Sequence, residues 1–381
     1  MTPDFNRDVH CLLGLPIDAL DIDAVVRRLR DAVRDRSRCF LSTPNLNFAI
    51  AAQSDAAFRG SVLHSDLSVA DGMPLVWVAR LLGIPLRERV AGATLFERLR
   101  LRVGAAAPVN VYFFGGPDGV AARACERLNA APSALRCVGF DAPGFGTVEA
   151  MSGEAQLARI DASGADFVVV ALGARKGQAW IERNRGRLLA PLISHLGAVV
   201  NFAAGTVARA PRWVQRLGLE WLWRIKEEPG LWRRYAKDGV AFVHLLVTRV
   251  VPHAIHARRT GPSAAQLAAA RLETTADAQG AELRLRGAWS HANLAPLRAA
   301  LAQVARGRAV VRIDLGDVTH LDAAAVALLS LLWAHCARAG VPCRIDPVAP
   351  AARRVFRYCC AEYALEPLPA AARPARGAPA C

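Results

Sequence analysis

The first 200 residues alternate short apolar runs with segments of helical periodicity. AVVRRLRDAV and GVAARACERLNA carry apolar residues at the three-to-four spacing of a helix. Strands that alternate with helices predict an α/β fold, a Rossmann-like and mostly parallel sheet flanked by helices on both faces. The apolar runs that predict buried strands, each ending in turn residues, are CFLST (39–43), VNVYFFGG (109–116), LRCVGFDAPG (135–144) and DFVVVALG (166–173).

The ends of these predicted strands define a candidate ligand site. In parallel sheets of this kind, ligands bind at the carboxyl ends of the strands. We therefore expect Thr43, Gly115, Gly116 and Gly173 to lie near one edge of the sheet. Asp71 follows another short apolar run, in VADGMP, and is a candidate for the same edge.

A second pattern begins after residue 235. GVAFVHLLVTRVVPHAI (239–255) is apolar with basic flanks, and residues 205–260 contain 11 basic and 4 acidic residues. No stretch of about 18 apolar residues without a charge occurs, so the pattern favours a peripheral membrane contact over a spanning helix. A solvated helix beside a core helix explains the composition equally well.

The last third of the chain predicts a second, smaller α/β unit. AELRLRGAWS, AVVRIDLGDV and VPCRIDPV predict strands, and LAPLRAALAQVA and AAAVALLSLLWAHCARAG predict helices. The final residues are rich in Pro and Ala, which is typical of disorder. The predicted parts are a first domain (1–235), a basic amphipathic membrane-associating segment (236–262), a linker (263–280), the small α/β domain (281–366) and a disordered tail (367–381).

Charge narrows the range of partners. The 48 basic and 33 acidic residues give a net charge of +15, which favours nucleic acid, an anionic membrane face or phosphorylated substrates. The excess is mostly arginine, and a GC-rich genome would produce the same bias. The basic residues cluster with tryptophans beside an apolar helix, and no nucleic-acid-binding fold is evident, so we do not expect a nucleic-acid partner.

Tryptophan and arginine are concentrated between Asn201 and Tyr235. Half of the eight tryptophans lie in this stretch. Guanidinium groups bind phosphate oxygens in a bidentate manner, and indole rings tolerate both water and lipid. The stretch therefore favours a phosphate-bearing ligand at a membrane interface. The alternative is a helix that packs its aromatic face on the core.

The cysteines and the N-terminus give little functional signal. The nine cysteines form no CxxC pair and no zinc-like spacing with histidine. Reduced, structural thiols in a cytoplasmic protein are therefore expected. The first 20 residues carry acids and a proline before any long apolar run, which is not typical of a signal peptide.

Three short segments of the first domain could carry chemistry. Asp71 could serve as a general base, or simply form a turn. Thr43 and Asn45 in STPNLNF could bind a polar ligand, or cap the following helix. The glycines of FFGGPDG would let backbone amides approach a phosphate at a helix N-terminus, although a glycine pair alone is weak support.

Taken in order, several short motifs resemble the WecG/TagA/CpsF family of bacterial glycosyltransferases over about residues 9–235. The family, as the resemblance implies, transfers a sugar with inversion, commonly of the N-acetylmannosamine type, from a UDP-sugar to a polyprenyl-diphosphate-linked acceptor. This implies a peripheral enzyme on the cytoplasmic face of the inner membrane, acting in exopolysaccharide or cell-envelope polysaccharide synthesis. The motifs are TPN (43–45), ADG (70–72), RVAG (89–92), FFGG (113–116), LGARKGQAWI (172–181), AAGTVARAPRW and LEWLWRIKEEP.

The resemblance also implies roles for individual residues. Asp71 would be the general base, and Thr43 and Asn45 would line the same catalytic pocket. Guanidinium groups would stabilise the departing diphosphate, so no metal or other cofactor is expected. The implied substrate-binding residues are Arg89, Gly115, Gly116, Gly173, Lys176, Gln178 and Arg209. The implied diphosphate- and lipid-binding residues are Arg212, Arg224, Arg233 and Arg234.

The chain departs from the family pattern at several positions. Where the family usually has GxPKQE, residues 173–178 are GARKGQ, so the proline, glutamine and glutamate are replaced. Asn201 stands where aspartate is common, and EPGLWRRY lacks an arginine often found after the proline. These changes would alter donor choice or weaken activity. A second hypothesis is therefore a non-catalytic scaffold that binds nucleotide sugar or lipid.

Residues 281–365 resemble a STAS domain through VVRIDLGDVTHLDAAAVALLSLL and AGVPCRIDPV. In phosphorylatable members of that family a serine follows the aspartate. Here Asp322 is followed by Ala323 and Ala324, which have no hydroxyl group to modify. The resemblance therefore implies a domain that binds a protein partner, or docks the enzyme near a membrane assembly, without a phosphorylation switch. A purely structural appendage is the alternative.

Overall fold

The chain divides into two compact units. The computed structural model describes residues 2–101, 107–216, 218–276, 280–307 and 309–369, without the side chains of Arg212 and Arg216. One unit is Ile17–Val247, and the other combines Met1–Pro16 with Thr248–Cys381. The sequence pattern groups residues 1–16 with the first domain. In the structure they pack with the C-terminal residues. Backbone groups of residues 5–14 form hydrogen bonds with Arg298, Cys359 and Tyr363 of that unit.

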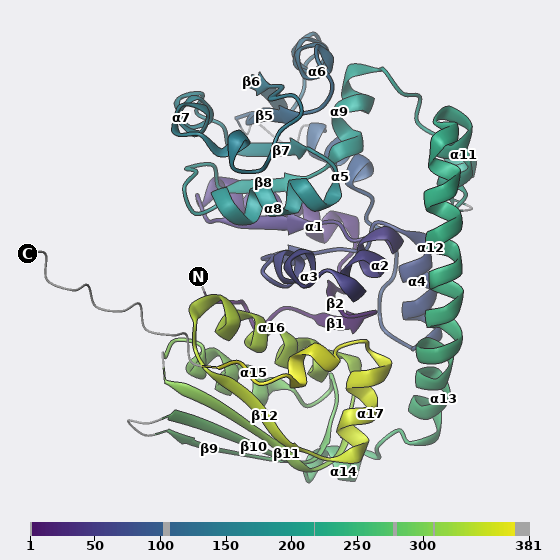
Figure 1. Cartoon of the computed structure of the whole chain (residues 1–381), viewed down its shortest axis with the longest axis vertical. Helices are drawn as coiled ribbons and strands as arrows, with labels where there is room; N and C mark the ends of the chain where they lie inside the picture. The colour runs from purple at the N-terminus through teal and green to yellow at the C-terminus, as the bar shows by residue number, and fades with distance from the viewer. Residues whose placement is uncertain (1, 102–106, 217, 277–279, 308, 370–381) are drawn as a thin grey trace, which may run out of the picture. The chain divides into compact units, whose positions relative to one another are not determined.

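The unit Ile17–Val247 contains a six-stranded sheet whose neighbouring strands are all parallel, in the order β4-β3-β8-β7-β5-β6 (Figure 1). Parallel strands need crossover connections, and helices supply them. The Rossmann-like prediction is confirmed. The strands are β3 (Cys39–Ser42), β4 (Leu67–Ser68), β5 (Val109–Gly115), β6 (Leu135–Asp141), β7 (Phe167–Ala171) and β8 (Leu192–His195).

Side chains that alternate along the strands build a separate core on each face of the sheet. Phe113 faces a cluster with helices α1, α5, α6 and α9, whereas the adjacent Phe114 faces a cluster with α7 and α8. Phe114 stacks on the fully buried Trp180 with ring centroids 4.3 Å apart. These helices are α1 (Ile22–Arg34), α5 (Gly92–Arg100), α6 (Val120–Asn129), α7 (Glu154–Ala162), α8 (Ala174–Asn184) and α9 (Gly197–Ala204).

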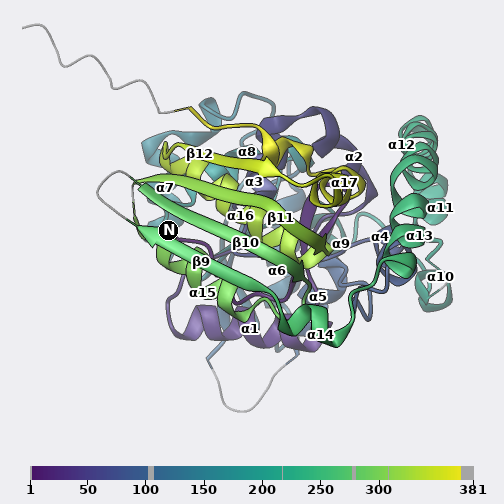
Figure 2. The same cartoon turned by 90° about the horizontal axis from the view of Figure 1, so that it is seen from below.

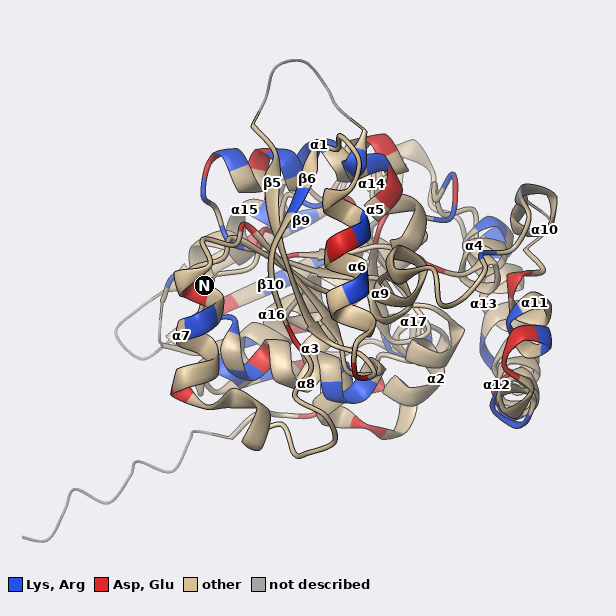
Figure 3. Ribbon diagram, turned by 90° about the horizontal axis from the view of Figure 1, so that it is seen from above, with Lys and Arg blue, Asp and Glu red and all other residues tan. Residues whose placement is uncertain are grey.

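The remaining helices of this unit follow the strands or close its C-terminal part. The stretch rich in tryptophan and arginine between Asn201 and Tyr235 forms several short helices and not one long helix, because Pro211 and Pro229 interrupt it. Figure 3 shows basic residues along α11 and α12. The bounds are α2 (Leu46–Ser54), α3 (Ala56–Leu63), α4 (Met73–Leu81), η1 (Ala150–Ser152), α10 (Arg212–Arg216), α11 (Glu220–Glu227), η2 (Pro229–Leu231) and α12 (Trp232–Leu245).

The second unit contains a four-stranded mixed sheet in the order β12-β11-β10-β9. Figure 2 shows these strands side by side. Strands β10, β11 and β12 are parallel, and β9 is antiparallel to β10. Helix α16 is almost wholly buried, in keeping with its continuous apolar sequence. The elements are β9 (Arg271–Ala276), β10 (Gly280–Trp289), β11 (Val310–Leu321), β12 (Cys343–Val348), α13 (Val251–Arg259), α14 (Ala264–Ala268), α15 (Ala295–Val304), α16 (Ala323–Ala339), α17 (Pro350–Tyr358) and η4 (Glu362–Leu365).

Residues 5–14 are built into this second unit. Strand β1 (Val9–Leu12), which pairs with β2 (Leu15–Asp18), packs against α16. The Gly14 N–H donates to the Cys359 carbonyl oxygen at 2.6 Å, and the Tyr363 hydroxyl donates to the Gly14 carbonyl oxygen at 3.0 Å. Arg298 on α15 donates to the carbonyl oxygens of Phe5 and Arg7.

Two segments differ from the sequence prediction. The expected linker 263–280 holds helix α14 and strand β9, which is exposed on most of its residues and therefore lacks the apolar signal of a buried strand. The expected disordered tail begins at residue 367, yet Leu368 pairs with Cys343 through two backbone hydrogen bonds. Residues 370–381 lie outside the described part of the chain.

The cysteines also differ from expectation. Cys125 on α6 and Cys137 on β6 form a disulfide, with their Cα atoms 5.2 Å apart. The spacing of 12 residues carries no recognisable sequence signal, since the pair meets only when α6 packs against β6. The other six described cysteines are free thiols, as expected.

The helix that leaves the first unit is unusually long. Helix α12 continues through a π-helical stretch, η3 (Leu246–Val250), into α13. Among the described residues, Pro229–Arg259 is one helical run that is long and apolar enough to cross a membrane. The sequence pattern did not predict a spanning helix. Length and composition alone do not distinguish a helix that crosses a membrane from one that lies on its surface.

Candidate active site

Asp71 lies where two strand ends and a helix start meet. It follows β4 and precedes α4, and its backbone N–H donates to the Pro44 carbonyl oxygen at 2.7 Å. Its carboxylate Oδ2 accepts the N–H of Gly92, the first residue of α5, at 3.2 Å. The turn-forming and ligand-facing interpretations of Asp71 are thus compatible, because its backbone builds the turn while its carboxylate faces a cavity.

The environment of Asp71 favours a proton acceptor near neutral pH. Burial raises the pKa of the Asp71 carboxyl to about 7, and the nearby Glu220 carboxylate also raises it. The Arg89 guanidinium, the Gly92 N–H and Arg209 oppose this increase in pKa. A general base works best when its pKa is close to the working pH. Asp71 therefore has the properties of a base at pH 7.

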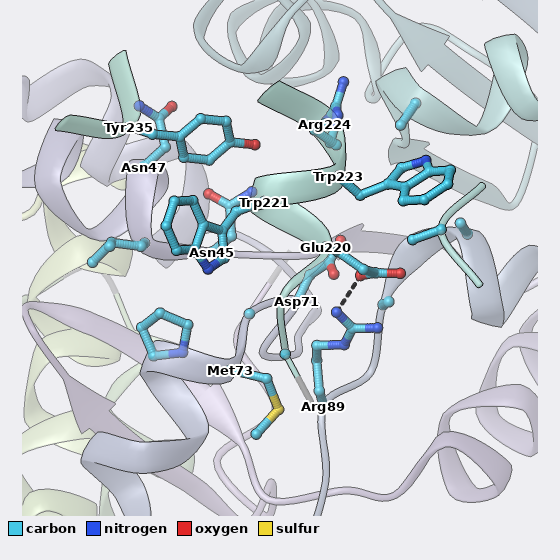
Figure 4. Close-up of a pocket in the computed structure, with 18 of the residues that line it drawn as sticks. Asn45, Asn47, Asp71, Met73, Arg89, Glu220, Trp221, Trp223, Arg224 and Tyr235 are labelled. Carbon is cyan, nitrogen blue, oxygen red and sulfur yellow. Dashed lines mark hydrogen bonds and ion pairs between the residues drawn. The ribbon is translucent and has the colours of Figure 1, made fainter. Parts of the chain in front are cut away.

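The Asp71 carboxylate faces a cavity of about 410 Å³ (Figure 4). Its walls come from the start of α2, the start of α4, residues 89–93, α9, residues 207–210, α11 and α12. Most of the lining is apolar or aromatic, with a few charged groups among them, as is typical of a small-molecule site. The polar and aromatic lining residues that matter here are Asn45, Asn47, Asp71, Trp77, Arg89, Arg209, Glu220, Trp221, Trp223, Arg224, Glu227, Glu228, Arg234, Tyr235 and Asp238.

Four arginines, Arg89, Arg209, Arg224 and Arg234, bring positive charge to this cavity. Arg89 forms an ion pair with Glu220, drawn as a dashed line in Figure 4, and Arg224 pairs with Glu228 at 3.3 Å. Arg209 donates from a terminal nitrogen to the Thr94 hydroxyl. The Nε atoms of Arg209 and Arg224 are buried without a hydrogen-bond partner among the described residues. Unused guanidinium donors of this kind suit phosphate oxygens.

The cavity brings together six of the residues predicted from the sequence. They are Asn45, Asp71, Arg89, Arg209, Arg224 and Arg234, and the last of these packs over the ring of Tyr235 at 5.1 Å. The side chain of Asn45 accepts the Phe48 N–H at 3.2 Å, so Asn45 also caps α2. Thr43 is buried, with 6% of its surface exposed, and does not line the cavity.

Other predicted residues lie away from the cavity. Gln178 is fully buried and bonds to the Ser42 hydroxyl at 2.9 Å, and the Lys176 Nζ donates to the Gly146 carbonyl oxygen at 2.8 Å. Gly116 and Gly173 do not line the cavity either. Arg233 packs over the Trp232 ring at 5.7 Å, outside the lining. The side chain of Arg212 lies outside the described part of the chain.

Gly115 has a structural reason to be glycine. Its φ of +102° is rarely adopted by other residues, and an added Cβ would lie 2.7 Å from the Ala171 carbonyl oxygen. This residue therefore lets the ends of β5 and β7 approach closely. Its position does not require a bound nucleotide to explain it.

The changed GARKGQ segment is explained partly by His195. An added Cβ on Gly177 would lie 2.3 Å from the His195 ring, so the glycine makes room for that ring against α8. Burial lowers the pKa of His195 to about 4, and its Nε2 is buried with no hydrogen-bond partner among the described residues. Neither residue lines the cavity around Asp71.

Sequence reasoning missed the acidic and amide residues that complete the cavity. Glu220 reaches Arg89 across 131 positions of the chain, and Asp238 accepts a 3.0 Å hydrogen bond from Asn47. Glu220 is the second residue of the LEWLWRIKEEP motif, so the motif contained the signal, although only its arginine, Arg224, was assigned a role. Within the described residues, no group of three or more His, Cys, Asp or Glu side chains is placed to hold a metal ion.

Two parts of the chain match known protein families. A model of the glycosyl transferase WecG/TagA/CpsF family matches residues 10–254, and a model described as Mlab, STAS domain, matches residues 272–361. The chain is 29% identical over 225 residues to the N-acetylglucosaminyldiphosphoundecaprenol N-acetyl-beta-D-mannosaminyltransferase of Bacillus spizizenii, which covers 58% of this chain and 85% of that protein. It is 27% identical over 194 residues to the enzyme of the same name from Bacillus subtilis. That alignment covers 51% of this chain and 73% of the relative.

Both resemblances drawn from the sequence motifs are confirmed by these matches. The family model spans more than half of the chain and contains every residue of the Asp71 cavity, whereas the STAS model matches the second sheet and its helices. The chain therefore belongs to the WecG/TagA/CpsF family of glycosyltransferases and is an enzyme with a STAS domain in its C-terminal part.

Proposed function

We propose that this enzyme transfers a sugar, of the N-acetylmannosamine type or similar, from a UDP-sugar to a polyprenyl-diphosphate-linked acceptor. The names of the two relatives described above denote an N-acetylmannosaminyltransferase that acts on a diphosphoundecaprenol-linked sugar. The observation that supports the proposal most is the cavity itself, which is lined by a carboxyl group of pKa about 7 and by four arginines. This combination suits a reaction that deprotonates a hydroxyl group and releases a diphosphate.

The proposed step is a single inverting displacement. The acceptor hydroxyl oxygen attacks the anomeric carbon of the donor sugar and loses its proton to the Asp71 carboxylate. The bond between the anomeric carbon and the diphosphate oxygen breaks at the same time, and its electron pair leaves with UDP. Arg89, Arg209 and Arg224 would stabilise the negative charge of the diphosphate groups, so the proposed step needs no metal ion.

The surface beside the cavity supports a peripheral membrane location. Trp232, Val240, Val243 and Val247 are all more than half exposed, and they lie on or next to α12 with basic residues between them. Exposed apolar side chains interleaved with Arg and Lys suit the anionic cytoplasmic leaflet of the inner membrane, where a polyprenyl acceptor is anchored. The proposed pathway is exopolysaccharide or cell-envelope polysaccharide synthesis.

The scaffold alternative rests on the changed residues 175–178. In the structure Gln178 is part of a buried hydroxyl network, and Lys176 bonds to a backbone carbonyl group. Neither side chain lines the Asp71 cavity. The changes therefore leave the proposed base and arginines in place, which favours a catalytic enzyme over a scaffold.

The STAS domain is proposed to bind a protein partner. Asp322 accepts the N–H groups of Ala324 and Ala325, each at 2.9 Å, and so caps α16. No hydroxyl group follows Asp322 at positions 323–325. Partner binding through this domain would therefore be constitutive rather than controlled by phosphorylation at that position.

Release of UDP tests the proposed reaction directly. Purified full-length protein is incubated with UDP-N-acetylmannosamine and a polyprenyl-diphosphate-linked N-acetylglucosamine, with and without a metal chelator. We expect UDP release that depends on both substrates and survives chelation. Asp71→Asn should reduce it at least about 100-fold, the usual contribution of a general base. Glu126→Gln, which neutralises an exposed carboxylate on α6, is the control for the change of charge. Full activity in Asp71→Asn would remove the base assignment.

A further inference from the structure

A carboxylate of the protein itself pairs with one of the cavity's arginines. Glu220 is the first residue of α11, and its carboxylate forms the ion pair with the Arg89 guanidinium. Both side chains are mostly buried, with 14% of Arg89 and 24% of Glu220 exposed. Figure 4 shows the two side chains directed toward each other beside Asp71.

The carboxylate of Glu220 and a phosphate group would use the same binding position. A guanidinium group presents a planar set of N–H donors that fits either a carboxylate or a phosphate in a bidentate manner. A phosphate that binds Arg89 must therefore displace Glu220 or share the guanidinium with it. Sharing is unfavourable because two anions would then lie close together in a partly buried site.

The arginines of the cavity differ in the partner that a phosphate group would have to displace. Arg224 has a carboxylate partner, Glu228, one helical turn away on the same segment. Within the described part of the chain, a terminal nitrogen of Arg209 donates to the Thr94 hydroxyl, and its Nε has no hydrogen-bond partner. Of these three arginines, Arg89 is the one whose carboxylate partner lies far away in the sequence, so its ion pair would break if α11 moved away.

We propose that Glu220 is a positioning residue that occupies Arg89 in the ligand-free enzyme, and that a diphosphate group of a substrate takes its place. Displacement of Glu220 releases the start of α11 from the loop that carries Arg89. Helix α11 also contributes Trp221, Trp223 and Arg224 to the cavity wall. Arrival of a diphosphate is thereby coupled to the position of that wall.

The test measures binding of inorganic pyrophosphate to the full-length protein by calorimetry, in metal-free buffer at pH 7.5. Glu220→Gln removes the competing charge, and Glu220→Asp keeps the charge but shortens the side chain by one methylene group. We expect both variants to bind pyrophosphate about tenfold more tightly or better, because a partly buried ion pair no longer has to be broken. Glu227→Gln is the matched control, since Glu227 also lines the cavity, lies on the same helix and carries the same charge.

The outcomes separate the proposal from simpler explanations. A similar gain in Glu227→Gln would mean that net charge alone controls binding, and it would overturn the proposal. Unchanged or weaker binding in both Glu220 variants, or loss of folding in both by thermal melting, would also overturn it by making the ion pair purely structural. A gain in Glu220→Asp with no gain in Glu227→Gln supports the exchange.

The proposal rests on the function proposed above, and the two can fail separately. Pyrophosphate binding needs neither a donor sugar nor turnover. If the wild-type protein releases no UDP but the Glu220 variants gain affinity, the proposed reaction fails and the exchange at Arg89 stands. If turnover is present and the variants do not gain affinity, the exchange fails and the reaction stands.

Discussion

The Nδ2 atom of Asn47 donates a 3.0 Å hydrogen bond to Oδ2 of Asp238 and so joins helix α2 to helix α12. Asp238 is almost fully buried, with 6% of its surface exposed. Asn47 lies one residue inside α2, whose cap residue Asn45 lines the cavity. The bond therefore fixes the long helix against the element that forms one wall of the site.

The link between Asn47 and Asp238 should control the mobility of α12. Asp238→Ala leaves the Asn47 amide without its partner, which we expect to cost about 1–3 kcal/mol of unfolding free energy. Amide hydrogen exchange of residues 232–245 should become faster, and KM for the lipid-linked acceptor should increase. Asp238→Asn, which keeps a carbonyl oxygen as acceptor, should behave more like the wild type. Identical exchange in wild type and Asp238→Ala would show that apolar packing alone holds the helix.

The pKa of Asp71 predicts how activity and stability depend on pH. As a base with a pKa of about 7, Asp71 should give a kcat/KM that increases about tenfold per pH unit below pH 7 and levels off above it. Any residual activity of Asp71→Asn should not show this increase of kcat/KM with pH. A pH profile that is flat from pH 5 to pH 8 would exclude Asp71 as the base.

The same pKa has the opposite consequence for folding. The folded state holds the Asp71 proton up to about pH 7, whereas the unfolded chain loses it near pH 3.8. Unfolding free energy should therefore decrease as the pH increases through this interval, by at most about 3 kcal/mol between pH 5 and pH 8. Because Asp71→Asn has no such proton, its melting temperature relative to the wild type should increase with pH. A difference that does not change with pH would contradict the assignment.

The exposed valines of α12 should contribute to membrane binding. Val240 and Val243 are 75% and 58% exposed. Replacing both with serine should weaken binding to vesicles that contain anionic phospholipid by about tenfold, because the membrane no longer buries this apolar surface. Thermal stability should change little. Val310→Ser, at an exposed position of β11, serves as the control in a vesicle co-sedimentation assay. Equal vesicle binding by the wild type, the double valine variant and Val310→Ser would exclude this surface as a membrane-binding site.

The N-terminal segment should be required for the stability of the second unit. Arg298→Ala removes the donor to the carbonyl oxygens of Phe5 and Arg7, and should make residues 1–16 more sensitive to limited proteolysis. We expect a loss of about 1–3 kcal/mol in unfolding free energy. Arg306→Ala, at an exposed site after the same helix, is the matched control. Equal cleavage of both variants would show that packing of β1 alone holds the segment.

Much of the sheet of the first unit was predictable because its strands are short, apolar and buried on both faces. Such strands give a strong local signal, and the carboxyl-end rule then places Asp71 near one edge. The resemblance to known motifs added Arg89 and the arginines of residues 201–235. Strand β9 gave no such signal, since most of its side chains are exposed.

The rest of the site depends on contacts between residues far apart in the chain. Nothing local connects Glu220 with Arg89, or Asn47 with Asp238, because each pair forms only when α11 and α12 fold over the cavity. Gln178 is polar and lies in a family motif, so it was assigned to the substrate. In the structure its partner is the Ser42 hydroxyl in the core, a choice that the sequence alone does not reveal.

The discontinuous make-up of the second unit has a consequence for the newly made protein. Residues 5–14 leave the ribosome well before their partners, which include Cys359 and Tyr363 and are made about 350 residues later. At the usual 5–20 residues per second, the apolar side chains of β1 wait roughly 20–70 s for their final cover. Residues 17–247 can complete their own core during that time. A factor that shields residues 5–14 during synthesis should therefore increase the yield of folded enzyme.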